Sequence, residues 1–202
     1  MKPIICVSQK SVCAEDFFVR VEKIFQQEVF AFILREKELS SEEYKALVLK
    51  LLPIAKQYPT PFFINGDFTL ACELGLGVQI PFHKYQELTK SPVPVGISIH
   101  STEEAEYIMQ QPKNIVVSHI LAGHIFATDC KKGAAPRGLD FLASVCRVIN
   151  QKIPVFGIGG INLENMPALR KAGANGGAVM SSCMKTAGIE ALLTELETRF
   201  YS

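Results

Sequence analysis

The chain has 202 residues, of which 48% are hydrophobic and 20% are charged, and its formal net charge is +1. This composition predicts one folded domain over residues 1–202 and argues against disorder. The lysines and arginines are scattered, and no apolar run approaches the ~20 residues that cross a bilayer, so we expect neither a nucleic-acid partner nor a membrane span.

The cysteines lie far apart and form no C-x-x-C pair; they are Cys6, Cys13, Cys72, Cys130, Cys146 and Cys183. This spacing favours neither a zinc site nor a thioredoxin-type motif. The acidic residues Glu15 and Asp16 follow the short apolar run 3–7, where a signal peptide would still need its apolar region. We therefore expect a cytoplasmic protein with reduced thiols.

Short runs rich in Val, Ile and Phe alternate with amphipathic stretches, which is typical of a parallel sheet covered by helices. The predicted strands are 4–8, 31–35, 61–65, 77–81, 95–100, 115–119, 155–159 and 177–181. The predicted helices are 15–27, 41–57, 68–73, 84–89, 103–110, 139–150, 163–172 and 189–200, of which the third and fourth are short. Either Ser40 or Ser41 is a predicted helix cap, and Asn162 is another.

Eight strands, each followed by a helix, predict the α/β class and a single (β/α)8 TIM barrel. A doubly wound open sheet is the alternative, but it usually has fewer strands and opens with a Gly-rich turn that this chain lacks. The active site of a barrel is built from the loops that follow its strands. Polar residues at the carboxyl ends of the strands are therefore the candidates for function.

Glycines and serines follow the last two predicted strands. Gly159 and Gly160 end the seventh strand, and Ser181 and Ser182 end the eighth. Exposed backbone N–H groups at such junctions bind anions, and barrels place phosphate sites at this position. We therefore expect these residues to bind a phosphate group. The alternative is that the glycines only permit tight turns.

The loop after the sixth strand, residues 123–133, is long, charged and bounded by glycines. His124 in this loop is the predicted catalytic residue, because an imidazole can take a proton from one carbon and return it to another near neutral pH. A solvent-facing loop histidine is the alternative. Cys130 could act as a nucleophile, but the sequence shows no neighbouring base for it.

Other polar side chains at the strand ends form a cationic set that is rich in hydrogen-bond donors. The further predicted substrate-binding residues are Arg35, Lys37, Asn65, Ser98, Thr128 and Lys131. Arg35 and Lys37 could clamp a carboxylate or a phosphate, with a surface charge cluster as the alternative. For His83, His100 and His119 we expect a place in the core or behind the ligand contacts rather than in catalysis.

Several of these segments together resemble the thiamine phosphate synthase and TenI superfamily, in the same order and over nearly the whole chain. They are LREK at 34–37, FING at 63–66, GISIHS at 96–101 with Glu104, 123–132, GIGGIN at 157–162, AGA at 172–174 and VMSS at 179–182. The resemblance implies a barrel enzyme of thiamin biosynthesis whose ligand is a small phosphorylated thiazole. Small barrels of this kind often pair, so a homodimer is also expected.

The superfamily has two activities. The synthases couple a pyrimidine diphosphate to a thiazole phosphate and hold magnesium with an Asn-Asp pair and a Gly-Gln-x-Asp motif. This chain has Asn65-Gly66 and PFHK at 81–84 in these places. Both metal-binding carboxylates that the resemblance implies are therefore absent, and the adjacent Asp67 is the only easy replacement.

The loop GHIFATDCKKG at 123–133 is similar to that of the tautomerase branch, whereas synthases have proline at the position of His124. The resemblance therefore implies a thiazole tautomerase that isomerises a carboxythiazole phosphate to its aromatic form, with Lys37 or Lys131 holding the carboxylate. One departure is Asp67, where tautomerases tend to have arginine. No metal or organic cofactor is expected for a tautomerase. The alternative is a synthase with an altered metal site, and only this alternative would require magnesium. A non-catalytic protein that binds thiazole phosphate is the third hypothesis.

Overall fold

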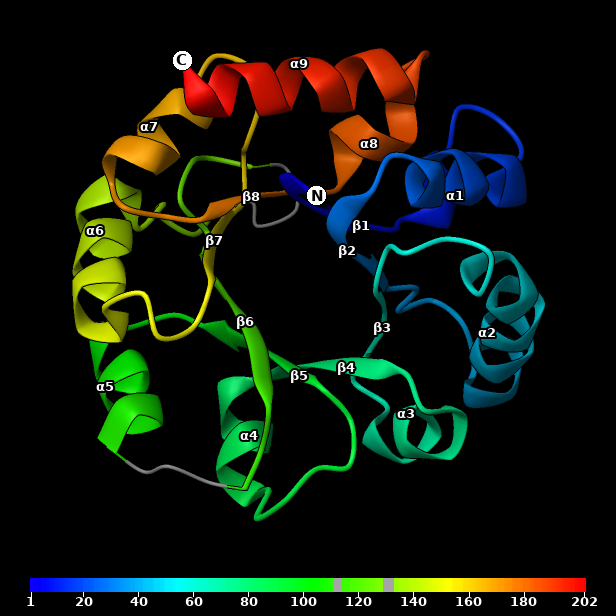
Figure 1. Cartoon of the computed structure of the whole chain (residues 1–202), viewed down its shortest axis with the longest axis horizontal. Helices are drawn as coiled ribbons and strands as arrows, with labels where there is room; N and C mark the ends of the chain where they lie inside the picture. The colour runs from blue at the N-terminus through cyan, green and yellow to red at the C-terminus, as the bar shows by residue number, and fades with distance from the viewer. Residues whose placement is uncertain (111–113, 129–132) are drawn as a thin grey trace.

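The computed structural model describes residues 1–110, 114–128 and 133–202. Eight parallel strands close into a barrel in chain order, and helices surround it (Figure 1). The predicted single (β/α)8 TIM barrel is confirmed. The strands are β1 (Lys2–Val7), β2 (Val29–Leu34), β3 (Phe62–Asn65), β4 (Gly77–Pro81), β5 (Val95–Ile99), β6 (Val117–Gly123), β7 (Val155–Ile158) and β8 (Gly176–Val179).

The helices form the outer layer of the barrel (Figure 1). They are α1 (Phe17–Gln26), α2 (Ser41–Ala55), α3 (Phe68–Leu74), α4 (Phe82–Glu87), α5 (Thr102–Gln110), α6 (Gly138–Ile149), α7 (Met166–Lys171), α8 (Ser181–Lys185) and α9 (Ile189–Tyr201), with a short 3-10 helix η1 (Lys10–Val12) after β1. Among the described residues, no helix combines the length and the apolar character that a membrane span requires.

The α2 helix shows how local sequence sets an element. Ser40 Oγ accepts the backbone N–H of Glu43 at 3.2 Å, and the Glu43 carboxylate accepts the N–H of Ser40 at 2.8 Å. These bonds lower the pKa of Glu43. Behind the cap, Tyr44, Leu47 and Leu51 recur at helical spacing and are buried against the barrel. Of the two predicted caps, Ser40 and Ser41, the structure thus has Ser40 as the cap.

Hydrophobic side chains fill two separate spaces. The larger cluster lies between the strands and the helices, and the smaller one fills the inside of the barrel. The inner cluster consists of Ile5, Val7, Ala31, Ile33, Phe63, Leu121, Phe156 and Ala178. Because the interior is packed, a ligand can enter only at an end of the barrel.

The sixth strand spans 117–123 instead of the predicted 115–119, so it ends four residues later than predicted. The prediction stopped at His119 because a polar residue interrupts the apolar run. The structure instead buries His119 inside the barrel, in register with Gly96 of β5, and the strand continues through Leu121. Val116 lies before the strand and is 68% exposed.

Two boundaries near the predicted phosphate site also differ. The α7 helix begins three residues later than predicted, because the Asn162 side chain accepts the N–H groups of Glu164 and Asn165 and caps a turn there. The β8 strand ends two residues earlier, and residues 181–185 form α8. A helix this short shows no periodicity in the sequence.

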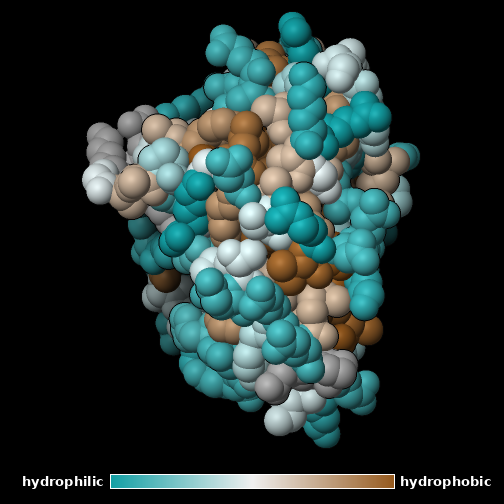
Figure 2. Space-filling view, turned by 90° about the vertical axis from the view of Figure 1, so that its left-hand side faces the viewer, coloured by the Kyte–Doolittle hydropathy of each residue, from teal (hydrophilic) through white to brown (hydrophobic). Residues whose placement is uncertain are grey.

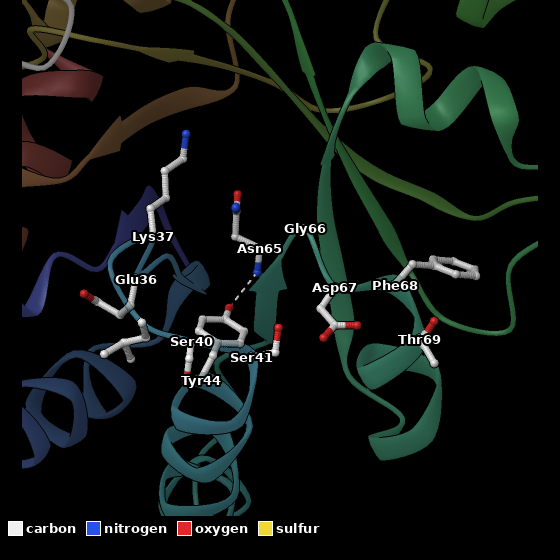
Figure 3. A pocket seen from close by; sticks show the side chains of 11 residues that line it. Glu36, Lys37, Ser40, Ser41, Tyr44, Asn65, Gly66, Asp67, Phe68 and Thr69 are labelled. Atoms are coloured by element: carbon white, nitrogen blue, oxygen red, sulfur yellow. Dashed lines mark hydrogen bonds between the residues drawn. The ribbon is translucent and has the colours of Figure 1, made fainter.

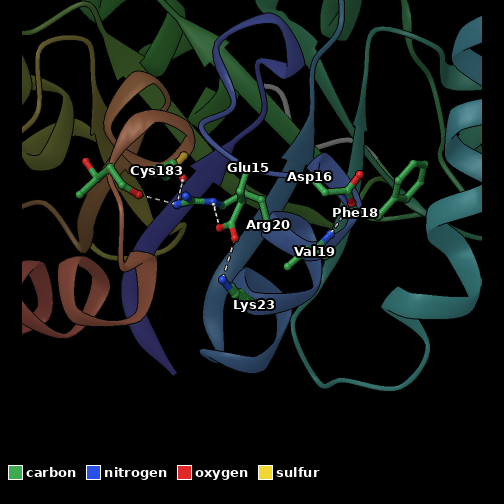
Figure 4. Close-up of polar contacts among 8 residues, drawn as sticks. Glu15, Asp16, Phe18, Val19, Arg20, Lys23 and Cys183 are labelled. Carbon is green, nitrogen blue, oxygen red and sulfur yellow. Dashed lines mark hydrogen bonds and ion pairs between the residues drawn. The ribbon is translucent and has the colours of Figure 1, made fainter.

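A buried arginine, Arg20, joins α8 to α1 (Figure 4). Its guanidinium lies 2.8 Å from the Glu15 carboxylate and donates to the carbonyl oxygens of Cys183 at 3.1 Å and Thr186 at 2.8 Å. Lys23 donates to Glu15 as well, and this bond together with the charge of Arg20 lowers the pKa of that carboxyl. Arg20 therefore fixes the helix that begins with the predicted anion ligands.

The face that carries α5, α6 and α7 mixes hydrophilic and hydrophobic side chains (Figure 2). Partly buried hydrophobic residues on these helices include Tyr107, Phe141 and Val148. The homodimer expected from the sequence stays a prediction.

Candidate active site

A cavity of about 1190 Å³, called the mouth below, opens at the carboxyl ends of the strands. The predicted site residues that line it are Arg35, Lys37, Asn65, Ser98, His124, Thr128, Gly159, Gly160, Ser181 and Ser182. Lys131, the remaining predicted residue, lies outside the described residues, as does Cys130. Closure of the barrel thus brings the ends of strands from β2 to β8 to one cavity.

Backbone N–H groups that have no partner among the residues the structure describes gather on one side of the mouth. Within the described part of the chain, no hydrogen bond is made by the amides of Gly160 and Ile161 after β7 or by those of Ser181 and Ser182 at the start of α8. The strands β7 and β8 are neighbours, so both groups of donors face the same corner. This is the arrangement that the sequence predicts for a phosphate site.

The two glycines after β7 also allow a close approach of the loop that follows β6. Gly160 has a φ of +67°, and a Cβ atom there would lie 2.5 Å from the carbonyl oxygen of Ala127 and 2.8 Å from Phe126 Cβ. Gly159, with a φ of +97°, would bring a Cβ atom to 2.9 Å from His124 Cα. The glycines therefore serve the packing of this loop as well as the exposure of their amides.

His124 is buried at the mouth, and the residue is 6% exposed. Its Nε2 atom lies 3.3 Å from the carbonyl oxygen of Ala134, and its Nδ1 atom has no hydrogen-bond partner among the described residues. Buried polar atoms are rarely left without a partner, so this nitrogen is a candidate for a contact with a ligand. The alternative of a solvent-facing loop histidine is wrong.

Arg137 holds the backbone on both sides of His124. Its Nε atom donates to the carbonyl oxygen of Gly123 at 3.1 Å, and its backbone N–H donates to the carbonyl oxygen of His124 at 2.9 Å. The guanidinium also lies 5.7 Å from the ring of Phe141, within the range of a cation–π contact. Sequence analysis missed Arg137, because its role depends on how the loop folds back.

The charged side chains of the described mouth are all cationic. Arg35, Lys37 and Lys185 line it, and no aspartate or glutamate does so in the ranges that the structure describes. None of these cations has a carboxylate within 4.0 Å among the same residues. The positive charge is therefore open to an anionic ligand. Lys185 was missed because α8 was not predicted.

Residues 4–183 match the protein family described as thiamine monophosphate synthase, TMP-TENI. The chain belongs to this family. It is 31% identical over 182 residues to a thiamine-phosphate synthase from Fusobacterium nucleatum, which covers 87% of this chain and 85% of that protein. It is 35% identical over 164 residues to a thiamine-phosphate synthase from Syntrophomonas wolfei, covering 78% and 76%.

A solved thiamine phosphate pyrophosphorylase from Pyrococcus furiosus has the same fold, with a TM-score of 0.79 at 24% identity over 98% of this chain and 95% of that one. The family match and the names of these relatives support a place for this chain in thiamin biosynthesis. Their names are those of synthases, and they do not specify the tautomerase branch.

The magnesium ligands that the resemblance implies for a synthase, an Asn-Asp pair and a Gly-Gln-x-Asp motif, are replaced in this chain by Asn65-Gly66 and by PFHK at 81–84. A second cavity of about 500 Å³ adjoins the mouth, and Lys37 and Asn65 line both (Figure 3). Asp67 lies in this second cavity, where its Oδ1 atom accepts the N–H of Leu70 at 2.9 Å and caps α3. No group of three His, Cys, Asp or Glu side chains suited to a metal occurs among the described residues.

The other histidines have different places. His119 is fully buried inside the barrel, as expected, and desolvation lowers its pKa to about 3. His83 and His100 are exposed, so neither lies in the core, and the alternative place behind the ligand contacts stays a prediction. His100 follows β5 and lines the mouth, whereas His83 lies on α4 and lines neither cavity.

Proposed function

We propose that this TMP-TENI protein is a thiazole tautomerase, an isomerase that converts an exocyclic-alkene carboxythiazole phosphate into its aromatic tautomer. The observation that carries the proposal is the composition of the mouth, where a buried histidine meets cations and unpaired amides, with no carboxylate among the described lining residues. Such a site suits a substrate that bears both a phosphate and a carboxylate. It needs neither a metal nor an organic cofactor.

In this proposal the substrate spans the mouth. The amides and hydroxyls at Gly160, Ser181 and Ser182 bind the phosphate, with Lys185 beside them. The carboxylate points across the cavity toward Arg35 and the other cation of the same loop, Lys37. Contacts with Asn65, Ser98, Thr128 and Gly159 complete the proposed binding set, and Lys131 remains a candidate for the carboxylate.

His124 carries the proton. In this proposal the ring carries its own proton on Nε2, which faces the Ala134 carbonyl oxygen, and the buried Nδ1 atom, which has no partner among the described residues, is the nitrogen that acts on the substrate. Nδ1 removes the proton from the ring carbon that bears the carboxylate, and the imidazolium returns a proton to the exocyclic carbon. The product ring is aromatic, so the driving force lies in the substrate, and the protein supplies position and a proton carrier.

Thiamine phosphate synthase is the second candidate, because the similar proteins bear that name. That reaction releases pyrophosphate, whose charge is usually neutralised by magnesium held by carboxylates. The described mouth offers none.

The test is to incubate the full chain with the product of the thiazole synthase in the presence of a chelator and to follow aromatisation by ultraviolet absorbance. We expect a rate well above the spontaneous one. Absence of aromatisation, together with magnesium-dependent coupling of the two thiamin precursors, would favour the synthase. Tight binding of the thiazole phosphate without either reaction would favour a non-catalytic protein.

A further inference from the structure

A chain of hydrogen bonds runs inside the barrel from His119 to the mouth. His119 Nε2 lies 2.8 Å from Gln79 Oε1, and Gln79 Nε2 donates to Ser98 Oγ at 2.9 Å. His119 and Gln79 are 0% and 2% exposed, whereas Ser98 is partly exposed and lines the mouth. The chain therefore connects a fully buried imidazole with a hydroxyl group that a ligand can reach.

The backbone of the barrel makes room for this connection. Gln79, Gly96 and His119 lie in register on the neighbouring strands β4, β5 and β6. A Cβ atom on Gly96 would collide with Gln79 Oε1 and would lie 2.5 Å from His119 Nε2. The glycine thus leaves the space in which the side chains on either side of it meet. Ser98 lies two residues further along β5, so its side chain is on the same face and nearer the mouth.

The protonation state of His119 sets the direction of the bonds. The ring packs edge-on against Phe63 and Phe156 and is removed from water, which lowers its pKa to about 3 and keeps it neutral. A neutral ring that faces the Gln79 carbonyl oxygen donates from Nε2, and its Nδ1 atom lies 3.3 Å from the Ser118 hydroxyl.

Gln79 then presents its NH₂ group to Ser98 Oγ, so the Ser98 oxygen acts as an acceptor within the barrel. The hydroxyl proton of Ser98 is left to point elsewhere, and the open side is the mouth.

We propose that Gln79 and His119 are positioning residues that fix Ser98 as a hydrogen-bond donor toward the mouth, so that the bound ligand presents an acceptor oxygen to Ser98 Oγ. The identity of that acceptor as the substrate carboxylate rests on the proposed function. Recognition by Ser98 then discriminates a carboxylated thiazole phosphate from one that lacks the carboxylate, independently of the phosphate site.

The first test needs no ligand. Nitrogen-15 NMR of the histidine side chains should show His119 as the neutral Nε2–H tautomer at pH 5 as well as at pH 7. The Nδ1–H tautomer, or a charged ring at pH 5, would overturn the proposed direction of the hydrogen bonds from His119 through Gln79 to Ser98, whatever the protein binds.

The second test measures binding of the aromatic carboxythiazole phosphate by calorimetry to the wild type, Ser98→Ala, Gln79→Met and the double variant. Each single change should weaken binding by about 10- to 100-fold, the usual effect of losing a bond to a charged acceptor. The double variant should bind no more weakly than Ser98→Ala, since Gln79 acts through Ser98. If Gln79→Met does not fold, Gln79→Glu serves instead, because its carboxylate turns the Ser98 proton away from the mouth.

Additive losses in the double variant would overturn the positioning role of Gln79. The same thiazole phosphate without its carboxylate should bind Ser98→Ala and the wild type equally, and an equal loss for both ligands would overturn the assignment of the acceptor. A wild-type protein that binds neither thiazole phosphate would contradict the proposed function. The tautomer of His119 would still test the direction of the hydrogen bonds to Ser98.

Discussion

His119 and His124 lie on the same strand and its following loop, and both are buried, yet their surroundings differ. Both ring nitrogens of His119 face polar partners, Gln79 and Ser118, inside a packed barrel. His124 lines the mouth, and its Nδ1 atom has no hydrogen-bond partner in the described ranges of the chain. Burial alone therefore does not single out a catalytic candidate, and His124 is the stronger candidate because it lines the mouth and its Nδ1 atom has no partner among the described residues.

The largest effect should follow from removing the unpaired imidazole. His124→Ala should lower turnover of the carboxythiazole substrate by about 10²-fold or more, the usual loss for a positioned acid–base group. Binding of the aromatic product should change little, since His124 moves a proton and does not hold the phosphate. Steady-state rates and calorimetry on one preparation measure both quantities. His83→Ala is the control with an exposed histidine outside the mouth, and near-wild-type turnover in His124→Ala would contradict the assignment.

The packing of the loop around His124 can be tested at Gly160. Gly160→Ala should destabilise the fold by about 2–3 kcal/mol and reduce turnover, because the added methyl group meets the backbone of Ala127 and the positive φ disfavours alanine. Urea unfolding and the aromatisation rate measure these effects.

Gly188→Ala is the matched control, since Gly188 has a φ of +70° but no atom within 4 Å of the added Cβ. We expect only about 1 kcal/mol of destabilisation there, with unchanged turnover. Equal turnover in the two variants would show that the loop does not depend on Gly160.

His119, the histidine with two polar partners, should make the stability of the fold depend on pH. Because burial lowers the pKa of His119 from 6.5 to about 3, the unfolded chain binds a proton that the folded chain does not bind between these values. The stability that the neutral His119 ring contributes to the fold is fully present above pH 6.5 and is lost as the pH falls toward 3. From about pH 7.5 to about pH 5 the free energy of unfolding should fall by about 2 kcal/mol from this group alone.

The control for this pH dependence is His119→Phe, measured by urea unfolding at the same pH values. Between about pH 7.5 and about pH 5, the free energy of unfolding of the variant should fall by about 2 kcal/mol less than that of the wild type. Parallel pH profiles for the two proteins would contradict the neutral, buried state of His119.

The smallest effect should come from a single cation of the mouth. Lys185→Ala should weaken binding of the thiazole phosphate by roughly fivefold, because in the proposed complex the amides of α8 and of the loop after β7 would still bind the phosphate and solvent screens the lost charge. Lys50→Ala, on the exposed face of α2, should bind as the wild type does. Equal affinities in both variants would exclude Lys185 from the phosphate site.

Much of this arrangement could be predicted from the sequence, because strand ends in a parallel barrel converge on one face. Polar residues as distant as Arg35 and Ser182 were assigned to one site for this reason, and the structure places both at the mouth. The same principle could not identify Arg137 or Lys185. Their positions depend on a returning loop and on a five-residue helix, neither of which has a periodic pattern.

The error at β6 has a related cause. A polar residue in an apolar run indicates the end of a strand unless a partner satisfies it, and the partner of His119 is Gln79, which lies 40 residues away. The sequence likewise predicted that the glycines expose amides for an anion, but the collision of a Gly160 side chain with Ala127 depends on tertiary packing. We therefore expect substitutions at Gly160 to disturb the packing of the loop after β6 as well as the binding of the phosphate.

The most direct test of the central claim compares two reactions on one preparation of the full chain. Aromatisation of the thiazole-synthase product is measured with a chelator, and formation of thiamin phosphate from the two precursors is measured with magnesium. We predict fast aromatisation without metal and no more than trace coupling, because the described mouth holds a buried imidazole and no carboxylate. Efficient magnesium-dependent coupling with no aromatisation would contradict the account.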